Sequence, residues 1–258
     1  MDVAAYLGRI GYKGALAPTL ETLRALHRQH VLTVPFENLD IGLGREIVLD
    51  PERFIQKIVC ERRGGFCYEL NGAFATLLSA MGFRVTLLAA RVSDKQEDAC
   101  KEFDHLALRI DLEEPWLADV GFGDNFLEPL RLVGRIEQQD AAGSFRLIEA
   151  GERWQLEARQ RDRSWLRQYD FSLAPRQLLD FAGMCRYHQT SRDSHFTRNR
   201  ICSLATPEGR ITLSGMRLII KADGRKEERV LATEADWHSA LRDYFGIALD
   251  RRAQKIML

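Results

Sequence analysis

The sequence predicts an α+β fold in which helices come first, antiparallel strands follow, and a small mixed α/β unit ends the chain. Apolar residues recur at helical spacing over positions 20–81, strand-forming residues dominate 85–169, and strand, turn and helix signals return after 211. No internal repeat and no linker rich in Pro, Gly or Ser separates these regions, so we expect one compact body. A chain of 258 residues is long enough to bury a sizeable core without metals or disulfides.

Three helices are expected in the first third of the chain. Thr19 is suited to cap a helix whose leucines stand at positions 20, 23 and 26. Asp50 and Pro51 open the second helix, because proline fits the first helical position. The third helix begins near Cys67, and Gly82 is suited to end it.

Strands are expected in the middle of the chain, and a hairpin followed by a helix near its end. The expected strands cover 85–92, 103–112, 116–120, 154–159 and 164–169, a density that favours an antiparallel barrel or sheet. A helix is expected over 178–187. Strands at 211–213 and 218–221 lead through a turn at Asp223-Gly224 to a strand at 227–231. Thr233 caps a final helix, which ends at Gly246.

The charge balance and the cysteine content limit the kinds of function that this chain can have. Lys plus Arg number 37 and Asp plus Glu also number 37, so nothing general draws the chain to nucleic acid or to an anionic membrane. No signal peptide and no apolar run long enough to cross a bilayer is visible. The five cysteines include no Cys-x-x-Cys pair, so we expect no disulfide framework, no metal site and a reducing cytoplasm.

Cys67 stands in the sharpest local motif. Two glycines precede it, which allow a tight turn or a close approach of another molecule, and Cys67 then enters the third predicted helix. A thiol at a helix N-terminus lies at the positive end of the helix dipole, which favours the thiolate. The remaining cysteines, at 60, 100, 185 and 202, are interpreted as small buried apolar residues.

A thiolate needs a base, and His105 is the histidine with the best-placed partner. The strand over 103–112 places His105 on the face opposite to its leucines. A hairpin centred on Leu112 puts His105 directly opposite Asp119, and a shift of the centre by one residue leaves the two as diagonal neighbours. His27, His30 and His238 are interpreted as members of solvated helix faces, and His188 and His195 have no evident partner.

These residues form a Cys–His–Asp set with a task for each group. Cys67 attacks, His105 takes the proton of the thiol, and Asp119 orients the imidazole and stabilises its charged form. After Asp119, two glycines flank Phe122, so Gly121, Gly123 and the Phe122 ring can come close to a ligand.

Several segments resemble the arylamine N-acetyltransferase family. Residues 63–71 (RGGFCYELN) are similar to its active-cysteine motif, 104–108 (DHLAL) to its histidine segment, and 117–123 (LADVGFG) to its aspartate segment. Further similar stretches lie at 34–39 (VPFENL), 195–204 and 209–213. The resemblance covers roughly residues 5 to 250 in the family's order, and the joint occurrence of the three catalytic segments is specific.

The resemblance implies a helical bundle over 1–83 that carries the cysteine, a central antiparallel β-barrel over 84–188 that carries His105 and Asp119, and a C-terminal α/β lid over 189–258. It implies a ping-pong reaction in which acetyl-CoA acetylates Cys67. An arylamine, a hydrazine or an N-hydroxyarylamine then takes the acetyl group. No metal, nucleic acid or membrane takes part in that reaction.

The resemblance also implies supporting residues. Glu37 and Arg63 are expected to form a buried pair that positions the cysteine loop, and loss of one partner of such a pair is costly. Phe36 and Phe122 are expected in the wall of an aromatic pocket. Contacts to substrate or CoA are expected from Asn71 together with Gly121 and Gly123. One departure lies near the lid, where Arg192 occupies a position at which many relatives have proline.

Three alternatives share parts of this prediction. A cysteine hydrolase would use the same triad but lose its acyl group to water. An amide synthase of the same family would close a macrolactam, for which it needs a pocket open to a long chain. A non-catalytic binding protein on this fold has no need for all three triad residues.

Overall fold

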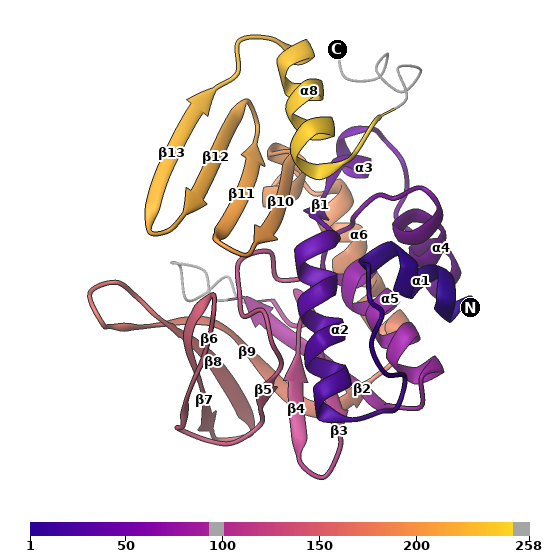
Figure 1. Cartoon of the computed structure of the whole chain (residues 1–258), viewed down its shortest axis with the longest axis vertical. Coiled ribbons are helices and arrows are strands. Elements are labelled where there is room, and N and C mark those ends of the chain that lie inside the picture. Colours follow the sequence, from indigo (N-terminus) through magenta and orange to yellow (C-terminus); the bar gives the residue numbers. More distant parts are fainter. Residues whose placement is uncertain (93–100, 250–258) are drawn as a thin grey trace.

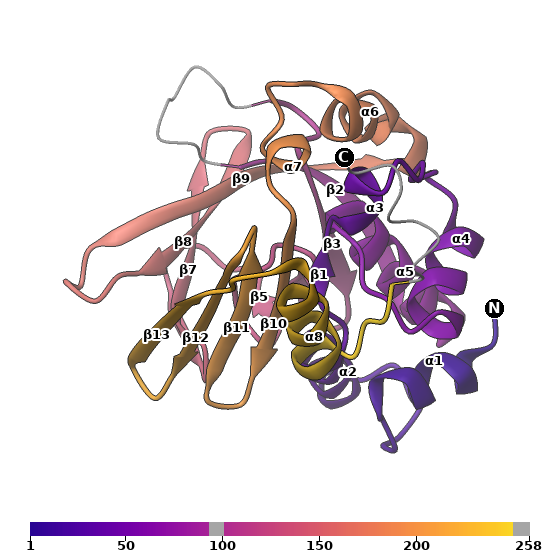
Figure 2. The same ribbon diagram turned by 90° about the horizontal axis from the view of Figure 1, so that it is seen from above.

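The structure is a computed structural model, which describes residues 1–92 and 101–249. Helices α1–α5 lie on one side of the molecule and two antiparallel sheets lie on the other, as Figures 1 and 2 show from two directions. Within the described residues, no helix is long and apolar enough to span a membrane.

The helical layer is built by segments whose ends carry local capping signals. Its members are α1 (Val3–Ile10), α2 (Leu20–Thr33), α3 (Leu39–Gly42), α4 (Pro51–Ile55), a π-helical turn (Gln56–Cys60) and α5 (Cys67–Ala80). The side chain of Thr19 accepts a hydrogen bond from the Thr22 N–H, and that of Asp50 accepts one from the Glu52 N–H. The three helices expected here are confirmed, although the second continues as a π-helical turn, whereas α1 and α3 were not predicted.

Eight antiparallel strands form the first sheet, in the order β5-β4-β3-β2-β9-β8-β7-β6. The strands are β2 (Arg84–Val92), β3 (His105–Asp111), β4 (Pro115–Ala118), β5 (Leu130–Arg131), β6 (Glu137–Asp140), β7 (Gly143–Ala150), β8 (Arg153–Arg159) and β9 (Trp165–Arg176). The chain after β5 returns to β7, where the Arg135 N–H donates to the Leu147 carbonyl over 2.7 Å. This contact places the segment after the edge strand β5 against β7, next to the other edge strand β6, so the sheet forms a nearly closed barrel.

The second sheet joins the C-terminal part of the chain to its beginning. Its order is β1-β10-β11-β12-β13, with β1 (Phe36–Glu37), β10 (Ile201–Thr206), β11 (Gly209–Ser214), β12 (Arg217–Ala222) and β13 (Arg225–Val230). Helix α8 (Glu234–Phe245) packs Trp237 and Leu241 against this sheet. β1 is an edge strand of this sheet, and its Phe36 also bridges Gly65 in the loop that precedes Cys67, so the C-terminal sheet is joined to the cysteine loop.

Two helical segments connect the barrel to the lid sheet. A 3₁₀ turn (Leu178–Phe181) leads into α6 (Ala182–Thr190), and the short α7 (His195–Arg198) follows. Figure 2 shows α6 and α7 beside the ends of β2 and β9. Helix α6 crosses position 188, where the barrel segment was expected to end. The division into 1–83, 84–188 and 189–258 stays a prediction.

The observed architecture agrees with the predicted α+β fold of bundle, barrel and lid. The hairpin turn at Asp223-Gly224 and the capping box of Thr233 and Asp236 on α8 are both present. Strands β1, β5, β6, β7 and β10 were missed. Of these, β1 and β5 are only two residues long and β6 is polar. Such segments carry no apolar alternation for the sequence to reveal.

Gly72 lets α4 pack closely on the helix that carries Cys67. A Cβ at this position would lie 2.6 Å from the buried Phe54 ring, whereas a Cβ at Gly8, inside α1, would meet nothing within 4 Å. Replacing a helix-interior glycine by alanine gains up to about 1 kcal/mol of stability when there is space, and overpacking a core costs about 1–3 kcal/mol.

We therefore expect Gly8→Ala to raise the free energy of unfolding and Gly72→Ala to lower it. Urea unfolding of the two variants and of the wild-type protein measures both changes. An equal gain of stability in the two variants would contradict the close packing of α5 on α4.

Candidate active site

Cys67 is the first residue of α5. The loop before it has room only for glycine at positions 64 and 65. A Cβ on Gly64 would lie 1.9 Å from the Pro35 carbonyl oxygen, and one on Gly65 would lie 2.7 Å from the Glu69 Cβ. The Glu69 side chain accepts the Phe66 N–H over 3.0 Å and so caps the helix. The two glycines therefore let the loop press against its neighbours and bring Cys67 to the helix N-terminus.

His105 begins β3, and Asp119 follows the last residue of β4. The register pairs Ile110 with Trp116 and Arg109 with Leu117, so the hairpin is centred on Glu113 and not on Leu112. Of the two arrangements that the sequence left open, direct opposition and diagonal neighbours, the diagonal one is observed. His105 Nε2 lies 2.8 Å from Asp119 Oδ2, and both residues are buried.

Asp119 is surrounded by hydrogen-bond donors. Its Oδ1 accepts the Asn71 side-chain amide over 2.9 Å and the Gly121 N–H over 3.0 Å. Burial opposes the ionised form, but the charge of His105 and these hydrogen bonds outweigh it and lower the pKa of Asp119. A carboxylate buried in this way remains available to orient the imidazole.

Cys67 and His105 line the same cavity, which has a volume of about 420 Å³. The loop that follows Asp119 packs directly on the cysteine, because a Cβ on Gly121 would lie 2.9 Å from the Cys67 Cα. Since His105 Nε2 is engaged by Asp119, Nδ1 is the ring nitrogen able to accept the proton of a thiol. The three residues predicted as a triad thus lie at one site.

Burial raises the pKa of the Cys67 thiol, and the nearby carboxylate of Asp104 acts in the same direction. From the sequence, only the helix N-terminus and a histidine partner were expected to act on this thiol, and both favour the thiolate. A lone thiolate at this depth is costly, whereas a thiolate paired with an imidazolium leaves no uncompensated charge. Ionisation of Cys67 therefore depends on transfer of its proton to His105.

The other predicted site residues divide into two groups. Phe36, Gly121 and Phe122 line the cavity with Cys67. Asn71 is fully buried and does not line it, because its amide donates to Leu106 O and Asp119 Oδ1 and accepts the Val120 N–H. Gly123 also lies outside the cavity lining, and its backbone packs against the Phe36 ring. From this position Asn71 can hold the Asp119 carboxylate in place, whereas contact with a substrate is less favoured.

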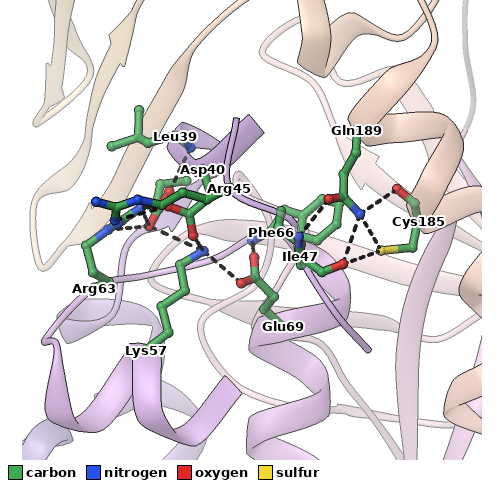
Figure 3. Close-up of polar contacts among 11 residues, drawn as sticks. Leu39, Asp40, Arg45, Ile47, Lys57, Arg63, Phe66, Glu69, Cys185 and Gln189 are labelled. Carbon is green, nitrogen blue, oxygen red and sulfur yellow. Dashed lines mark hydrogen bonds and ion pairs between the residues drawn. The ribbon is translucent and has the colours of Figure 1, made fainter. Parts of the chain in front are cut away.

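A buried charged cluster lies beneath the cysteine loop, formed by Glu37, Asp40, Lys57, Arg63 and Glu69. Arg63 contacts Glu37 at 2.7 Å, as expected, and Asp40 at 3.1 Å. Lys57 Nζ lies 2.7 Å from both Asp40 and Glu69 and connects the two halves of the cluster. Figure 3 shows Lys57 between Glu69 on one side and Asp40 on the other, with Arg63 pointing toward Asp40.

Three carboxyl groups in this cluster face two buried cations. Burial raises the pKa of Glu69 to about 7, against the opposing effect of Lys57. A proton on Glu69 near neutral pH balances the charge of the cluster. Glu69 also caps α5, so the charge balance of the cluster is linked to the start of the helix that carries Cys67.

Sequence reasoning missed several groups of the site. His27 and His30 are fully buried, so the prediction of a solvated helix face is wrong for both. His188 lines the cavity, and its Nε2 lies 3.2 Å from the Asp104 carboxylate. The partners of His27, and the Asp104 partner of His188, are about 80 to 100 residues away in the sequence, so no local signal could have revealed them.

Two further outcomes concern the remaining cysteines and metal sites. Cys185 and Cys202 are buried as expected, Cys60 is exposed against expectation, and Cys100 lies outside the described residues. The exposed Cys60 ends the π-helical turn, which the sequence did not predict. In the described part of the chain, no group of three or more His, Cys, Asp or Glu residues is placed to hold a metal ion.

The fold and the site define an N-acetyltransferase, and a family model of that description matches residues 19–254. The chain belongs to the arylamine N-acetyltransferase family and is an acyltransferase of that family. It is 36% identical over 249 residues to the arylamine N-acetyltransferase of Escherichia coli, covering 95% of this chain and 88% of the relative.

Two other similar proteins extend this comparison. An arylamine N-acetyltransferase / N-hydroxyarylamine O-acetyltransferase of Salmonella typhimurium is 35% identical, over 95% of this chain and 89% of the relative. A solved structure of Mycobacterium marinum arylamine N-acetyltransferase in complex with CoA has a TM-score of 0.90 and 35% identity, covering 95% of this chain and 93% of that one. The likeness therefore extends through the helices, the barrel and the lid.

We expect Lys57→Met to destabilise the protein by about 3–5 kcal/mol, because it leaves three buried carboxyl groups with one buried cation. Urea unfolding at pH 7 measures the change. Lys226→Met is the matched control, because Lys226 pairs with Glu228 on the exposed strand β13, where an ion pair contributes little. An equally small effect of the two substitutions would contradict the importance of the buried cluster.

Proposed function

We propose that this protein transfers an acetyl group from acetyl-CoA to the nitrogen of arylamines and arylhydrazines through an acetyl-Cys67 intermediate. Transfer to the oxygen of N-hydroxyarylamines is proposed as a second reaction of the same site, because the similar Salmonella typhimurium protein is also named an N-hydroxyarylamine O-acetyltransferase. The observation that carries the proposal is that Cys67 and His105 line one cavity while Asp119 holds the His105 imidazole. A thiol used in this way suits a reducing compartment, so the cytoplasm is proposed as its location.

The first half-reaction begins from the Cys67 thiolate and the His105 imidazolium. The thiolate attacks the acetyl carbonyl carbon of acetyl-CoA, a carbon–sulfur bond forms, and the CoA thiolate leaves. His105 gives its proton to the departing sulfur and becomes neutral. One thioester replaces another, so this step is close to isoenergetic and needs neither ATP nor a metal.

The second half-reaction restores the ion pair. The amine nitrogen attacks the acetyl carbon of acetyl-Cys67, and the cysteine leaves as a thiolate. His105 takes the proton that the nitrogen loses, and Asp119 stabilises the resulting imidazolium. Because an amide is more stable than a thioester, this step proceeds downhill and releases the product.

The cavity supports an aromatic acceptor. The rings of Phe36 and Phe122 line it near Cys67, and Phe122 packs edge-to-face on His105 with ring centroids 5.4 Å apart. Aromatic surfaces arranged in this way favour a flat apolar ligand. The acceptor amine would then lie beside the sulfur and the base.

Intact-mass spectrometry after addition of acetyl-CoA alone tests the first half-reaction. We expect a gain of about 42 Da on the wild-type protein and none on Cys67→Ala. Addition of aniline should then remove the added mass and yield the N-acetylated product. Loss of the acetyl group to water at the same rate with and without aniline would identify a hydrolase. An adduct that aniline cannot discharge would point to an amide synthase.

We expect Asp119→Asn to lower kcat by on the order of 10³–10⁴-fold with little loss of stability, because the imidazole loses its orienting negative charge. Steady-state acetylation of aniline and thermal unfolding measure the two effects. Asp111→Asn is the control, since this carboxylate pairs with Arg109 on the partly exposed part of the same hairpin. Turnover close to wild type in Asp119→Asn would refute the proposed role.

A further inference from the structure

His27, on α2, contacts the backbone of Asp119 through a direct hydrogen bond. The Asp119 N–H donates to His27 Nε2 over 3.1 Å, and His27 Nδ1 lies 2.8 Å from the carbonyl oxygen of Leu127. The segment from Asp119 to Leu127 includes Gly121 and Phe122, which line the catalytic cavity. His27 therefore holds this loop at both of its ends.

The two partners fix the protonation state of the ring. A carbonyl oxygen can only accept, so Nδ1 carries the hydrogen, and an amide N–H can only donate, so Nε2 has a free lone pair. His27 is fully buried between Phe74 and Phe126, with ring centroids 5.9 and 5.5 Å away. If His27 were protonated, its Nε2–H would face the Asp119 N–H, and the hydrogen bond between them would be lost.

The charged groups around His27 do not overcome its burial. Asp119 and Asp140 both favour the protonated ring, yet burial dominates and lowers the pKa of His27. The ring consequently stays neutral, with the single tautomer that both of its partners require.

We propose that His27 is a positioning residue for the transfer reaction. It orients Asp119 through the Asp119 backbone and so keeps the His105–Asp119 pair correctly placed beside Cys67. This inference rests on the proposed function. His27 acts through other residues, because it does not line the catalytic cavity. Misplacement of reacting groups by about 1 Å can cost on the order of 10²-fold in rate.

His30 provides a matched control on the same helix. It is also fully buried and packs on Phe74, at a centroid distance of 5.3 Å. Within the described residues, neither of its ring nitrogens has a hydrogen-bond partner. Phenylalanine at either position keeps an aromatic ring in the core, but only His27→Phe removes bonds to the loop.

The experiment compares His27→Phe with His30→Phe in two measurements. We expect kcat for aniline acetylation to fall on the order of 10²-fold in His27→Phe and to stay near the wild-type value in His30→Phe. The pH midpoint of Cys67 alkylation by iodoacetamide should rise in His27→Phe alone, because a displaced Asp119 stabilises the imidazolium less well. Equal losses of activity in both variants, with no change of this midpoint, would overturn the proposal.

Two conservative substitutions separate the two bonds of the ring. Glutamine at position 27 places its oxygen near the position of Nε2 and can accept the Asp119 N–H, whereas asparagine places its amide near Nδ1 and can donate only to Leu127. The proposal predicts higher kcat for His27→Gln than for His27→Asn, and the reverse order would overturn it. These variants also test the proposal if His27→Phe does not fold.

The alkylation measurement does not depend on the identity of the acceptor. If wild-type protein transfers no acetyl group but the alkylation midpoint still rises in His27→Phe, the proposed function fails while the positioning role of His27 stands. If wild-type protein transfers acetyl groups and His27→Phe behaves as His30→Phe does, the positioning role alone fails.

Discussion

One buried carboxylate constrains the whole site. Asp119 must remain ionised in the interior, and it does so because His105, Asn71 and the Gly121 N–H all donate to it. These donors come from the first barrel hairpin, from α5 and from the loop that follows β4. These hydrogen bonds therefore fix the position of the helical layer relative to the barrel. The same burial that surrounds Asp119 also raises the pKa of the Cys67 thiol. The thiolate and the imidazolium can form only as a pair.

In the charged cluster beneath the cysteine loop, buried carboxylates are likewise stabilised by buried partners. Lys57 joins Asp40 to Glu69, and Arg63 joins Asp40 to Glu37. Glu37 belongs to β1, the strand that pairs with β10 of the lid sheet. The cluster thereby connects the helix that presents Cys67 to the C-terminal sheet. Removal of one member leaves a buried charge without a partner, which is why such a cluster is costly to change.

Much of the fold was predictable because its signals are local. Thr19, Asp50 and Thr233 cap the helices that were expected to begin there, and Gly82 and Gly246 adopt the positive φ expected after a helix. The hairpin of β3 and β4 was predicted with its centre one residue from the observed one. Two-residue or polar strands such as β5 and β6 were missed, because they carry no alternation of apolar residues.

The sequence by itself determined the Cys67 loop, the alternation that gives His105 and Asp119 a common face, and the motifs that resemble one family. Only the tertiary structure decided which buried polar groups meet. His27 was expected in solvent and instead holds the Asp119 backbone, and Asn71 was expected at a substrate and instead supports the Asp119 carboxylate. The physical reason is that caps and periodicity are set by residues a few positions apart, whereas the partner of a buried polar group is chosen by the packing of distant segments.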